Sequence, residues 1–213
     1  MIQTINELIK KNGTPFYMFD EEGFVNNYRK LESTFKAVYP NYQISYSYKT
    51  NYTPFVCKLV KSLGGYAEVV SDMEYTLAKK LGYANSQIVY NGPSKGEEMY
   101  EHLENHGILN LDSLDEAKRV VDYCKAHVDK QYTVGMRINM DLGAANFISR
   151  FGLEPDSKDM LEVVKLIKDT PNLKLIGLHC HISRCRGVDA WAERAKIMLD
   201  MADKYIDDVP QYI

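Results

Sequence analysis

A lysine at the end of a patterned stretch is the first residue that could do chemistry. Residues 43–51 place Tyr46 and Tyr48 on one face and Ser47 and Lys49 on the other. This period of two is typical of a half-buried strand. Because lysine forms Schiff bases with carbonyl compounds, a lysine above small serines at a strand end predicts a ligand site. The competing interpretation is a lysine that reaches from the strand end into water.

Two histidines and an arginine follow the same pattern later in the chain. Residues 177–182 read Gly-Leu-His-Cys-His-Ile, so His179 and His181 share one strand face. Arg137 shares a strand face with Gly135 and Asn139. We expect both histidines to point into one cavity. An arginine that faces the same way needs an anionic partner, either a protein carboxylate or a ligand phosphate or carboxylate.

The elements that position these residues are expected to alternate between strands and helices. Three serines, at 71, 94 and 113, each precede a glutamate by three residues, which predicts a capping box at three helix starts. Thr53 before Pro54 predicts another helix start, and Asp20 is expected to cap a helix. The expected strands are 16–19, 43–51, 66–70, 88–90, 108–111, 132–139 and 173–182, and the expected helices are 4–13, 20–38, 53–64, 71–82, one from 94, 113–126, 158–168 and 189–205.

Strands that alternate with helices predict parallel strands joined by right-handed crossovers. Six such units follow residue 43, with a strand and helix in front. We therefore expect an α/β fold of the (β/α)8 TIM-barrel type, incomplete and forming a single domain over residues 1–213. A doubly wound sheet is the competing architecture, but no GxGxxG or Walker-type glycine loop follows a predicted strand.

In a barrel, functional side chains lie at the carboxyl ends of the strands. This rule selects six candidates: Lys49, Glu68, Asn91, Arg137, His179 and His181.

Composition excludes several other classes of protein. The 213 residues are 45% hydrophobic and 26% charged with a net charge of −3, which is ordinary for a globular protein and lacks the basic surplus of a nucleic-acid-binding chain. Neither a signal peptide nor an apolar run of membrane length is present in the sequence. We expect a cytoplasmic protein that acts on a small molecule.

Five motifs resemble those of the ornithine and diaminopimelate decarboxylases of fold type III. Those enzymes combine an alanine-racemase-like barrel, which binds pyridoxal 5'-phosphate, with a C-terminal β-domain. The resemblance covers nearly the whole chain from residue 14, and the five motifs occur in the family's order. They are Tyr-Ser-Tyr-Lys-Thr-Asn at 46–51, Ala-Glu-Val-Val-Ser at 67–71, Met-Arg-Ile-Asn at 136–139, Ser-Arg-Phe-Gly at 149–152, and residues 177–182.

The resemblance implies a cofactor, a reaction and a role for each candidate. Lys49 would hold pyridoxal phosphate as an internal aldimine, His181 would stack on its ring, and Arg137 would lie beside its polar edge. The implied reaction is decarboxylation of a basic or dicarboxylic amino acid of the diaminopimelate, ornithine or lysine type, by an enzyme that is a homodimer at full length. Implied for cofactor binding are Lys49, Glu68, Arg137, His181 and Ser183; implied for substrate contact or support are Asn91, Arg150, His179 and Arg184.

The sequence departs from the family pattern at two places. Glu68 stands where the family usually has aspartate, and Ser183-Arg184 follows Ile182 where Gly-Ser is common. The family's glycine-rich phosphate loop and its C-terminal β-domain lie beyond these residues. We therefore expect this chain to be an N-terminal portion that binds the cofactor weakly and does not turn over alone.

Three alternatives remain open at this stage. The first keeps the cofactor but racemises the amino acid, and the second is a non-catalytic module that binds pyridoxal phosphate. The third is a metal-dependent hydrolase that uses His179 and His181 as ligands. His102 and His106 lie four apart but do not form HExxH, and we expect both on a solvated helix face.

Overall fold

The computed structural model describes residues 2–140, 149–181 and 187–213, which divide into two compact units, 1–44 and 45–213. The first unit contains helices α1 (Ile2–Asn12) and α2 (Glu21–Lys36). As predicted, Asp20 caps α2, because its carboxylate accepts a hydrogen bond of 2.9 Å from Gly23 N. The prediction of a strand at 16–19 is wrong. A strand needs a hydrogen-bonded neighbour, and no strand pairing involves these residues in the described part of the chain.

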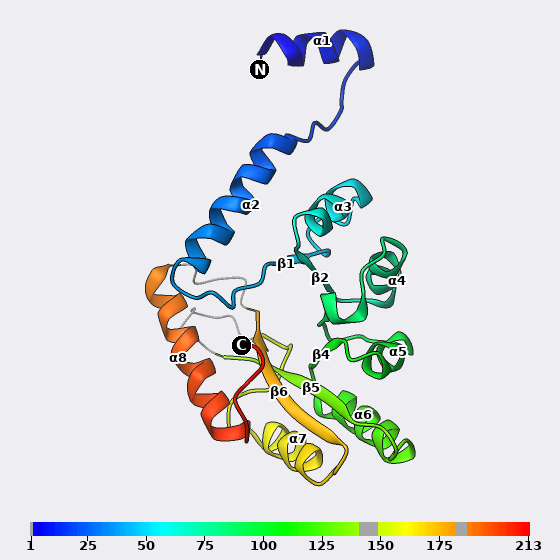
Figure 1. Cartoon of the computed structure of the whole chain (residues 1–213), viewed down its shortest axis with the longest axis vertical. Helices are drawn as coiled ribbons and strands as arrows, with labels where there is room; N and C mark the ends of the chain where they lie inside the picture. Colours follow the sequence, from blue (N-terminus) through cyan, green and yellow to red (C-terminus); the bar gives the residue numbers. More distant parts are fainter. Residues whose placement is uncertain (1, 141–148, 182–186) are drawn as a thin grey trace. The chain divides into compact units, whose positions relative to one another are not determined.

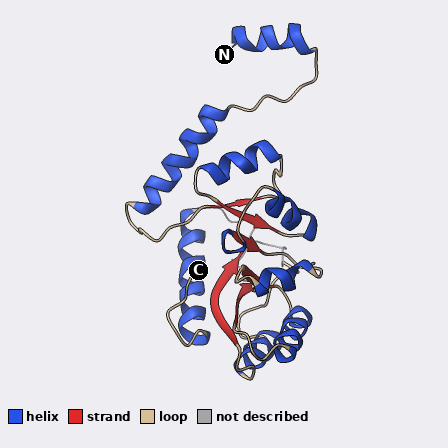
Figure 2. Cartoon of the chain, turned by 45° about the vertical axis from the view of Figure 1, so that its right-hand side comes forward, coloured by secondary structure: helices blue, strands red, loops and turns tan. Residues whose placement is uncertain are grey.

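A six-stranded parallel sheet forms the centre of the second unit (Figures 1 and 2). Neighbours in the sheet are also neighbours in sequence, as they are around a barrel, whereas a doubly wound sheet reverses its order at a switch point. The predicted barrel-type α/β fold is therefore confirmed. The strands are β1 (Ser45–Ser47), β2 (Tyr66–Val69), β3 (Ile88–Tyr90), β4 (Ile108–Leu111), β5 (Tyr132–Ile138) and β6 (Leu173–Cys180).

Helices follow the strands and surround them in chain order (Figure 1). Ser71 and Ser113 cap two of these helices, accepting hydrogen bonds from Glu74 N at 3.3 Å and from Glu116 N at 3.2 Å. The serine half of each predicted capping box is therefore confirmed, but the two glutamate side chains accept from Val70 N and Asp112 N instead of the serine backbone. Among the described residues, no helix combines the length and apolar character that a membrane crossing requires. The helices are α3 (Pro54–Ser62), α4 (Asp72–Lys80), the 3-10 helix η1 (Asn85–Gln87), α5 (Glu98–Glu104), α6 (Leu114–Ala126), α7 (Lys158–Lys168) and α8 (Val188–Tyr205).

The predicted capping box at Ser94 is wrong. Helix α5 begins at Glu98, and its N-cap residue, Glu97, makes no side-chain cap hydrogen bond. The preceding loop is held by Lys95, whose buried ammonium donates to Gly92 O at 2.7 Å and to Glu116 at 2.9 Å. These contacts anchor the backbone before the helix starts.

The opening strand is shorter than predicted. It ends at Ser47, because a turn follows in which Thr50 N and Thr50 Oγ1 both donate to Ser47 O, at 3.2 and 2.7 Å. One further ladder bond, from Tyr48 N to Glu68 O at 2.9 Å, keeps Tyr48 fully buried in the core. Lys49 therefore lies in the turn after the strand rather than in the strand.

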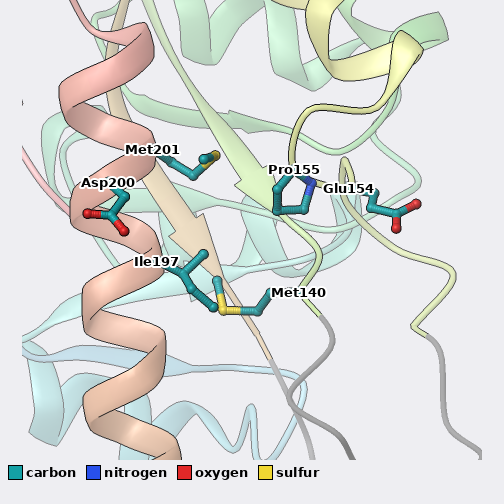
Figure 3. A pocket seen from close by; sticks show the side chains of 6 residues that line it. All are labelled: Met140, Glu154, Pro155, Ile197, Asp200 and Met201. Carbon is teal, nitrogen blue, oxygen red and sulfur yellow. The ribbon is translucent and has the colours of Figure 1, made fainter.

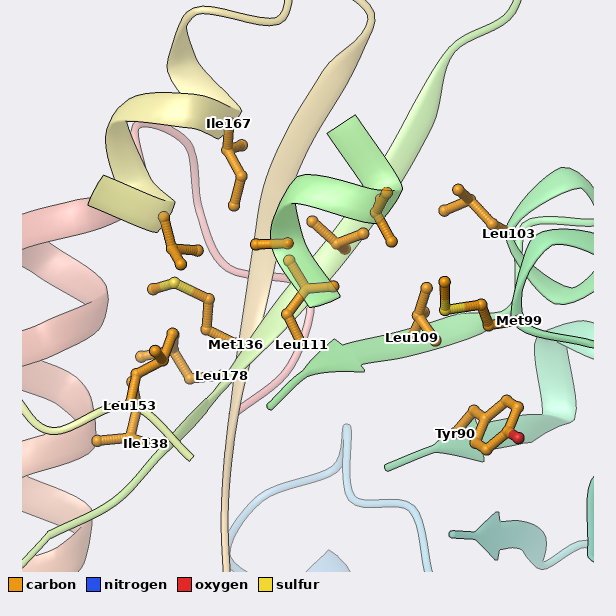
Figure 4. Packing of buried hydrophobic residues seen from close by; sticks show 14 of the residues in the cluster. Tyr90, Met99, Leu103, Leu109, Leu111, Met136, Ile138, Leu153, Ile167 and Leu178 are labelled. Carbon is orange, nitrogen blue, oxygen red and sulfur yellow. The ribbon is translucent and has the colours of Figure 1, made fainter. Parts of the chain in front are cut away.

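The hydrophobic core fills the space between the strands and the helices (Figure 4). Alternate residues of β4 and β5, with Leu178 of β6, point outward into it and are almost completely buried, which is worth about 2 kcal/mol for each large apolar side chain. The residues between them point to the inner side of the sheet. The labelled outward-facing residues are Leu109, Leu111, Met136, Ile138 and Leu178, which pack near Met99 and Leu103 of α5 and Ile167 of α7.

Two residues near the C-terminus extend the sheet beyond β6. Gln211 N donates to Ile176 O at 2.8 Å, and Leu178 N donates to Tyr212 O at 3.3 Å. Tyr212 forms a parallel bridge with Gly177. This seventh strand position was not predicted.

Candidate active site

Lys49 and Glu68 meet at the carboxyl end of the first two strands. Ser47 at the end of β1 is in register with Glu68 on β2, and the Lys49 turn follows directly. The Lys49 Nζ lies 3.6 Å from Glu68 Oε1. The lysine side chain is 35% exposed and the glutamate side chain 12%, so the amine is reachable while its counter-ion is held inside.

Arg137 makes the buried ion pair that its position predicts. Its Nη1 donates to Asp112 Oδ1 at 2.7 Å, and both side chains are less than 8% exposed. The other oxygen of Asp112 accepts a hydrogen bond from Gly152 N at 3.2 Å. The anionic partner is therefore a protein carboxylate, and the partner fixes both the arginine and the loop.

The Ser-Arg-Phe-Gly motif packs onto the Arg137 side chain. The guanidinium groups of Arg137 and Arg150 both lie over the Phe151 ring, 5.3 Å and 4.9 Å from its centroid. Gly152 has a φ of +86°, and a Cβ there would lie 3.0 Å from Arg137 O. Only glycine fits this close approach without strain.

His179 is half-buried at the end of β6, opposite Arg137 in the ladder, and its Nδ1 atom is buried. Burial lowers the pKa of His179 to about 3, and the positive charges of Arg137 and Lys49 act in the same direction. The imidazole is therefore neutral at neutral pH. His181 follows the strand and is exposed, and its charge also acts on His179.

Three buried polar atoms near these residues lack a hydrogen-bond partner within the described ranges. They are Ser47 Oγ, Arg137 Nε and His179 Nδ1. Buried polar groups are normally satisfied, so such atoms indicate a place where a polar ligand completes the contacts. A reachable amine beside these atoms fits pyridoxal phosphate, which carries an aldehyde, a ring nitrogen and a phosphate.

The structure places most of the predicted residues on one side of the sheet. Asn91 follows β3 and donates to Glu68 Oε1 at 3.2 Å, which joins it to the Lys49 pair. Arg150 is exposed and is linked to Arg137 through the Phe151 ring, which both guanidinium groups contact. Ser183 and Arg184 lie outside the described residues.

Sequence reasoning missed three buried polar residues. Asp112 directly follows β4, so the strand-end rule that selected the other candidates could have found it. Lys95 and Glu116 form a buried ion pair of 2.9 Å, and Glu116 Oε2 also accepts from Asp112 N at 2.8 Å. No sequence pattern marks Lys95, since the signal at the neighbouring Ser94 predicts a helix start and not a buried lysine.

The described surface has two hollows, one away from the candidate site and one beside the Lys49 turn. The first, of about 370 Å³, lies between α8 and the segment after β5 (Figure 3) and is lined by Met140, Glu154, Pro155, Ile197, Asp200 and Met201. The second, of about 380 Å³, is lined by residues 50–54, immediately after Lys49. Because the first hollow contains none of the predicted site residues, we place the candidate site by side-chain geometry.

The histidines outside this site give no support to a metal centre. His102 was expected on a solvated face, but it is fully buried, with Nε2 3.2 Å from Ile108 O and Nδ1 3.4 Å from Asn85 Nδ2. Burial lowers the pKa of His102 to about 4. Throughout the described residues, no group of three or more His, Cys, Asp or Glu side chains is arranged to hold a metal ion.

A fold of this type with a reachable lysine at its carboxyl edge defines a cofactor-binding barrel, and comparison with known families gives its class. The family model described as "Pyridoxal-dependent decarboxylase, pyridoxal binding domain" matches residues 25–206. The chain belongs to this family, which confirms the predicted resemblance and pyridoxal phosphate as its cofactor.

Similar proteins include several diaminopimelate decarboxylases. The chain is 28% identical to that of Methanocaldococcus jannaschii, covering 91% of this chain and 48% of the relative, and 32% identical to that of Bacteroides thetaiotaomicron, covering 79% and 45%. A crystal structure of the M. jannaschii enzyme in complex with L-lysine is 26% identical, with a TM-score of 0.80, and the match covers 95% of this chain and 51% of that chain. The chain thus spans about half the length of these relatives.

Proposed function

We propose that this chain forms the cofactor-binding part of a pyridoxal-phosphate-dependent amino-acid decarboxylase, with Lys49 as the point of attachment. The observation that carries this proposal is the Lys49 amine, 3.6 Å from the Glu68 carboxylate, at the carboxyl edge of a parallel barrel-type sheet. Decarboxylation is favoured over racemisation and over a non-catalytic module because the family and the relatives above are decarboxylases.

The residues proposed to hold the cofactor are those implied by the family motifs. When bound, pyridoxal phosphate accepts the electron pair that remains after carbon dioxide leaves the amino acid. Lys49 supplies the nucleophilic amine, and Glu68 keeps that amine at the sheet edge. The proposed cofactor-binding residues are Lys49, Glu68, Arg137, His181 and Ser183, and those proposed for substrate contact or support are Asn91, Arg150, His179 and Arg184.

The geometry suggests how Arg137 and His179 act. Asp112 fixes the Arg137 guanidinium, so Nε is presented in one orientation to a polar group of a ligand. Neutral His179 adds a polar ring without a further positive charge beside Arg137 and Lys49. Both side chains are therefore preorganised, which lowers the entropy cost of binding.

The proposed substrate is a basic or dicarboxylic amino acid of the diaminopimelate, ornithine or lysine type. The L-lysine bound in the M. jannaschii enzyme supports a small amino acid as the ligand. We also propose that the full-length protein is a cytoplasmic homodimer and that residues 1–213 act as a single domain. No nucleic-acid or membrane partner is proposed.

Cofactor attachment tests this function directly. The protein is mixed with pyridoxal phosphate, reduced with borohydride and digested, and the labelled peptide is identified by mass spectrometry. We expect the label at Lys49, together with visible absorbance before reduction, and the loss of both in Lys49→Ala. Lys125→Ala, at another lysine of the same unit, is the matched control. Labelling that is unchanged in Lys49→Ala contradicts the proposal.

Turnover is a separate prediction. We expect this chain alone to release no carbon dioxide from diaminopimelate, ornithine or lysine, because it matches only about half the length of the decarboxylases to which it is similar. The measurement is release of labelled carbon dioxide from each amino acid. Robust release by the 213-residue chain would show this expectation to be wrong.

A further inference from the structure

A row of hydrogen bonds crosses the inner side of the sheet and ends at Lys49. Tyr212 OH donates to Asn110 Oδ1 at 2.8 Å, and Asn110 Nδ2 donates to Asn91 Oδ1 at 2.8 Å. Asn91 Nδ2 then donates to Glu68 Oε1 at 3.2 Å, and this same oxygen lies 3.6 Å from Lys49 Nζ. We call Tyr212, Asn110 and Asn91 the relay. It joins the C-terminal residues to the proposed cofactor lysine.

The sheet is built to admit the Tyr212 ring. Asn110, Gly135, Gly177 and Tyr212 are aligned in register across four neighbouring strand positions. The tyrosine reaches over both glycines to Asn110. A Cβ on Gly135 would overlap Tyr212 OH and Asn110 Oδ1, and a Cβ on Gly177 would overlap the ring. These two inner-face positions therefore leave space for one specific contact.

The chemistry of the groups fixes the direction of the relay. An ionised carboxylate can only accept hydrogen bonds, so Asn91 must turn its amide nitrogen toward Glu68 and its oxygen toward Asn110. Asn110 must in turn present its nitrogen to Asn91 and its oxygen to Tyr212. Burial raises the pKa of Tyr212, which keeps its hydroxyl protonated as the donor.

Burial makes this arrangement costly to break. Asn91 and Asn110 are 2% and 1% exposed, so a lost partner leaves a polar group unsatisfied inside the sheet. Glu68 is also buried. The relay can thus hold one orientation of Glu68 more tightly than the lysine alone can.

We propose that Asn91, Asn110 and Tyr212 are positioning residues that hold the Glu68 carboxylate beside the Lys49 amine. A catalytic role for the relay rests on the proposed function of Lys49. The effect of the relay on the Glu68–Lys49 ion pair can be measured without cofactor. Loss of the relay frees Glu68 to turn away, which leaves Lys49 without its counter-ion and more reactive as a nucleophile.

The test is competitive labelling of the full chain with acetic anhydride at fixed pH, read lysine by lysine by mass spectrometry. Lys168, an exposed lysine 2.7 Å from Asp207, is the internal standard. We expect Glu68→Gln, Asn91→Ala and Asn110→Ala each to raise the labelling of Lys49 by about two- to fivefold, the size that corresponds to losing a partly exposed ion pair. Tyr212→Phe raises it in the same direction by less.

Asn110→Ala is the decisive variant because Asn110 contacts neither Glu68 nor Lys49 in the hydrogen-bond row. Adding Glu68→Gln to it must produce no further rise, since both changes remove the same interaction. Tyr83→Phe is the matched control: it removes one buried hydroxyl, 3.0 Å from Cys57 O, outside the relay. We expect it to leave Lys49 labelling unchanged.

The outcomes separate the relay from the proposed function. Unchanged Lys49 labelling in a folded Asn110→Ala variant overturns the relay. If circular dichroism shows that Asn110→Ala is unfolded, Tyr212→Phe becomes the deciding variant. Unchanged labelling in Glu68→Gln also overturns it, because the ion pair would then have no effect. Attachment of pyridoxal phosphate elsewhere than Lys49 refutes the proposed function while leaving the labelling result intact.

Discussion

At the scale of single residues, the site depends on charges that are paired inside the protein. Arg137 and Asp112 are both almost completely buried and lie 2.7 Å apart. Removing one partner of such a pair leaves an uncompensated buried charge, whereas removing both does not. The loss of stability per removed side chain is therefore expected to be larger in a single variant than in the double variant.

We predict that Asp112→Ala destabilises the protein by about 3–5 kcal/mol, measured by urea unfolding. Arg137→Ala combined with Asp112→Ala is expected to cost less than the sum of the two single changes. Asp207→Ala, at a pair of the same 2.7 Å length whose side chains are 46% and 78% exposed, is the control and should change stability by less than about 1 kcal/mol. An Asp112→Ala variant as stable as Asp207→Ala would contradict this reading.

Residue types predicted part of the site but not its connections. Strand-end position identified Glu68, Asn91 and Arg137, because parallel strands deliver their last residues to one edge. The partner of Arg137 was expected to be anionic but could not be chosen, since sequence alone does not set the register between β4 and β5. The roles of the individual residues stay predictions.

At the scale of elements, serine caps set the helix starts where the loop allows it. Ser71 and Ser113 accept from the backbone three residues on, and the glutamates at those positions reach one residue further back, to Val70 N and Asp112 N, each at 2.8 Å. Ser94 has the same spacing in sequence, yet α5 begins at Glu98. The contacts of Lys95 override the local signal there.

These three serines give a matched set of stability variants. We predict that Ser71→Ala and Ser113→Ala each cost about 1 kcal/mol, because each removes a cap hydrogen bond. Ser94→Ala is expected to change stability by less than about 0.5 kcal/mol, as an exposed residue without a cap contact. Urea midpoints at constant m-value measure all three, and equal losses would show that sequence spacing, rather than the observed start of α5, decides the cap.

At the scale of the whole molecule, the buried His102 and the half-buried His179 make stability depend on pH. Burial lowers the pKa of His102 to about 4 and that of His179 to about 3. The ordinary histidine pKa is about 6.5, so between these values the unfolded chain binds more protons than the folded protein. The contribution of these two histidines to the free energy of unfolding is therefore complete above about pH 6.5 and falls as the pH is lowered toward 4.

We predict that His102 alone contributes a loss of about 2 kcal/mol on going from pH 7 to pH 5, with His179 adding in the same direction. His102→Gln is expected to be less stable at pH 7 but to lose less on acidification. His127→Gln, at a helix C-cap position outside the core, is the control and should retain the full pH dependence. A His102→Gln variant with the same dependence as the unchanged protein would refute the assignment.

The sequence predicted the alternating strands and helices well, but it did not predict the strand position that pairs with β6. Helical and strand periods repeat strongly enough to fix the six βα units, and the order of the strands follows from short connections. The pairing of residues 211 and 212 with β6 had no signal, because two residues are too few to show a period. The solvated face predicted for His102 failed for a similar reason: Asn85 and Ile108, which bury it, come from other elements.

The hydrogen bond between Tyr212 and Asn110 joins residues 102 positions apart, and this separation has a consequence in time. A chain folds from its N-terminal end as it is synthesised, so Lys49, Glu68, Asn91 and Asn110 can gather long before Tyr212 exists. At about 5–20 residues per second, the interval is on the order of 5–20 seconds. Once Gly135 and Gly177 have been made, the space beside them stays unfilled until Tyr212 follows, so the proposed relay is complete only when the tyrosine is in place.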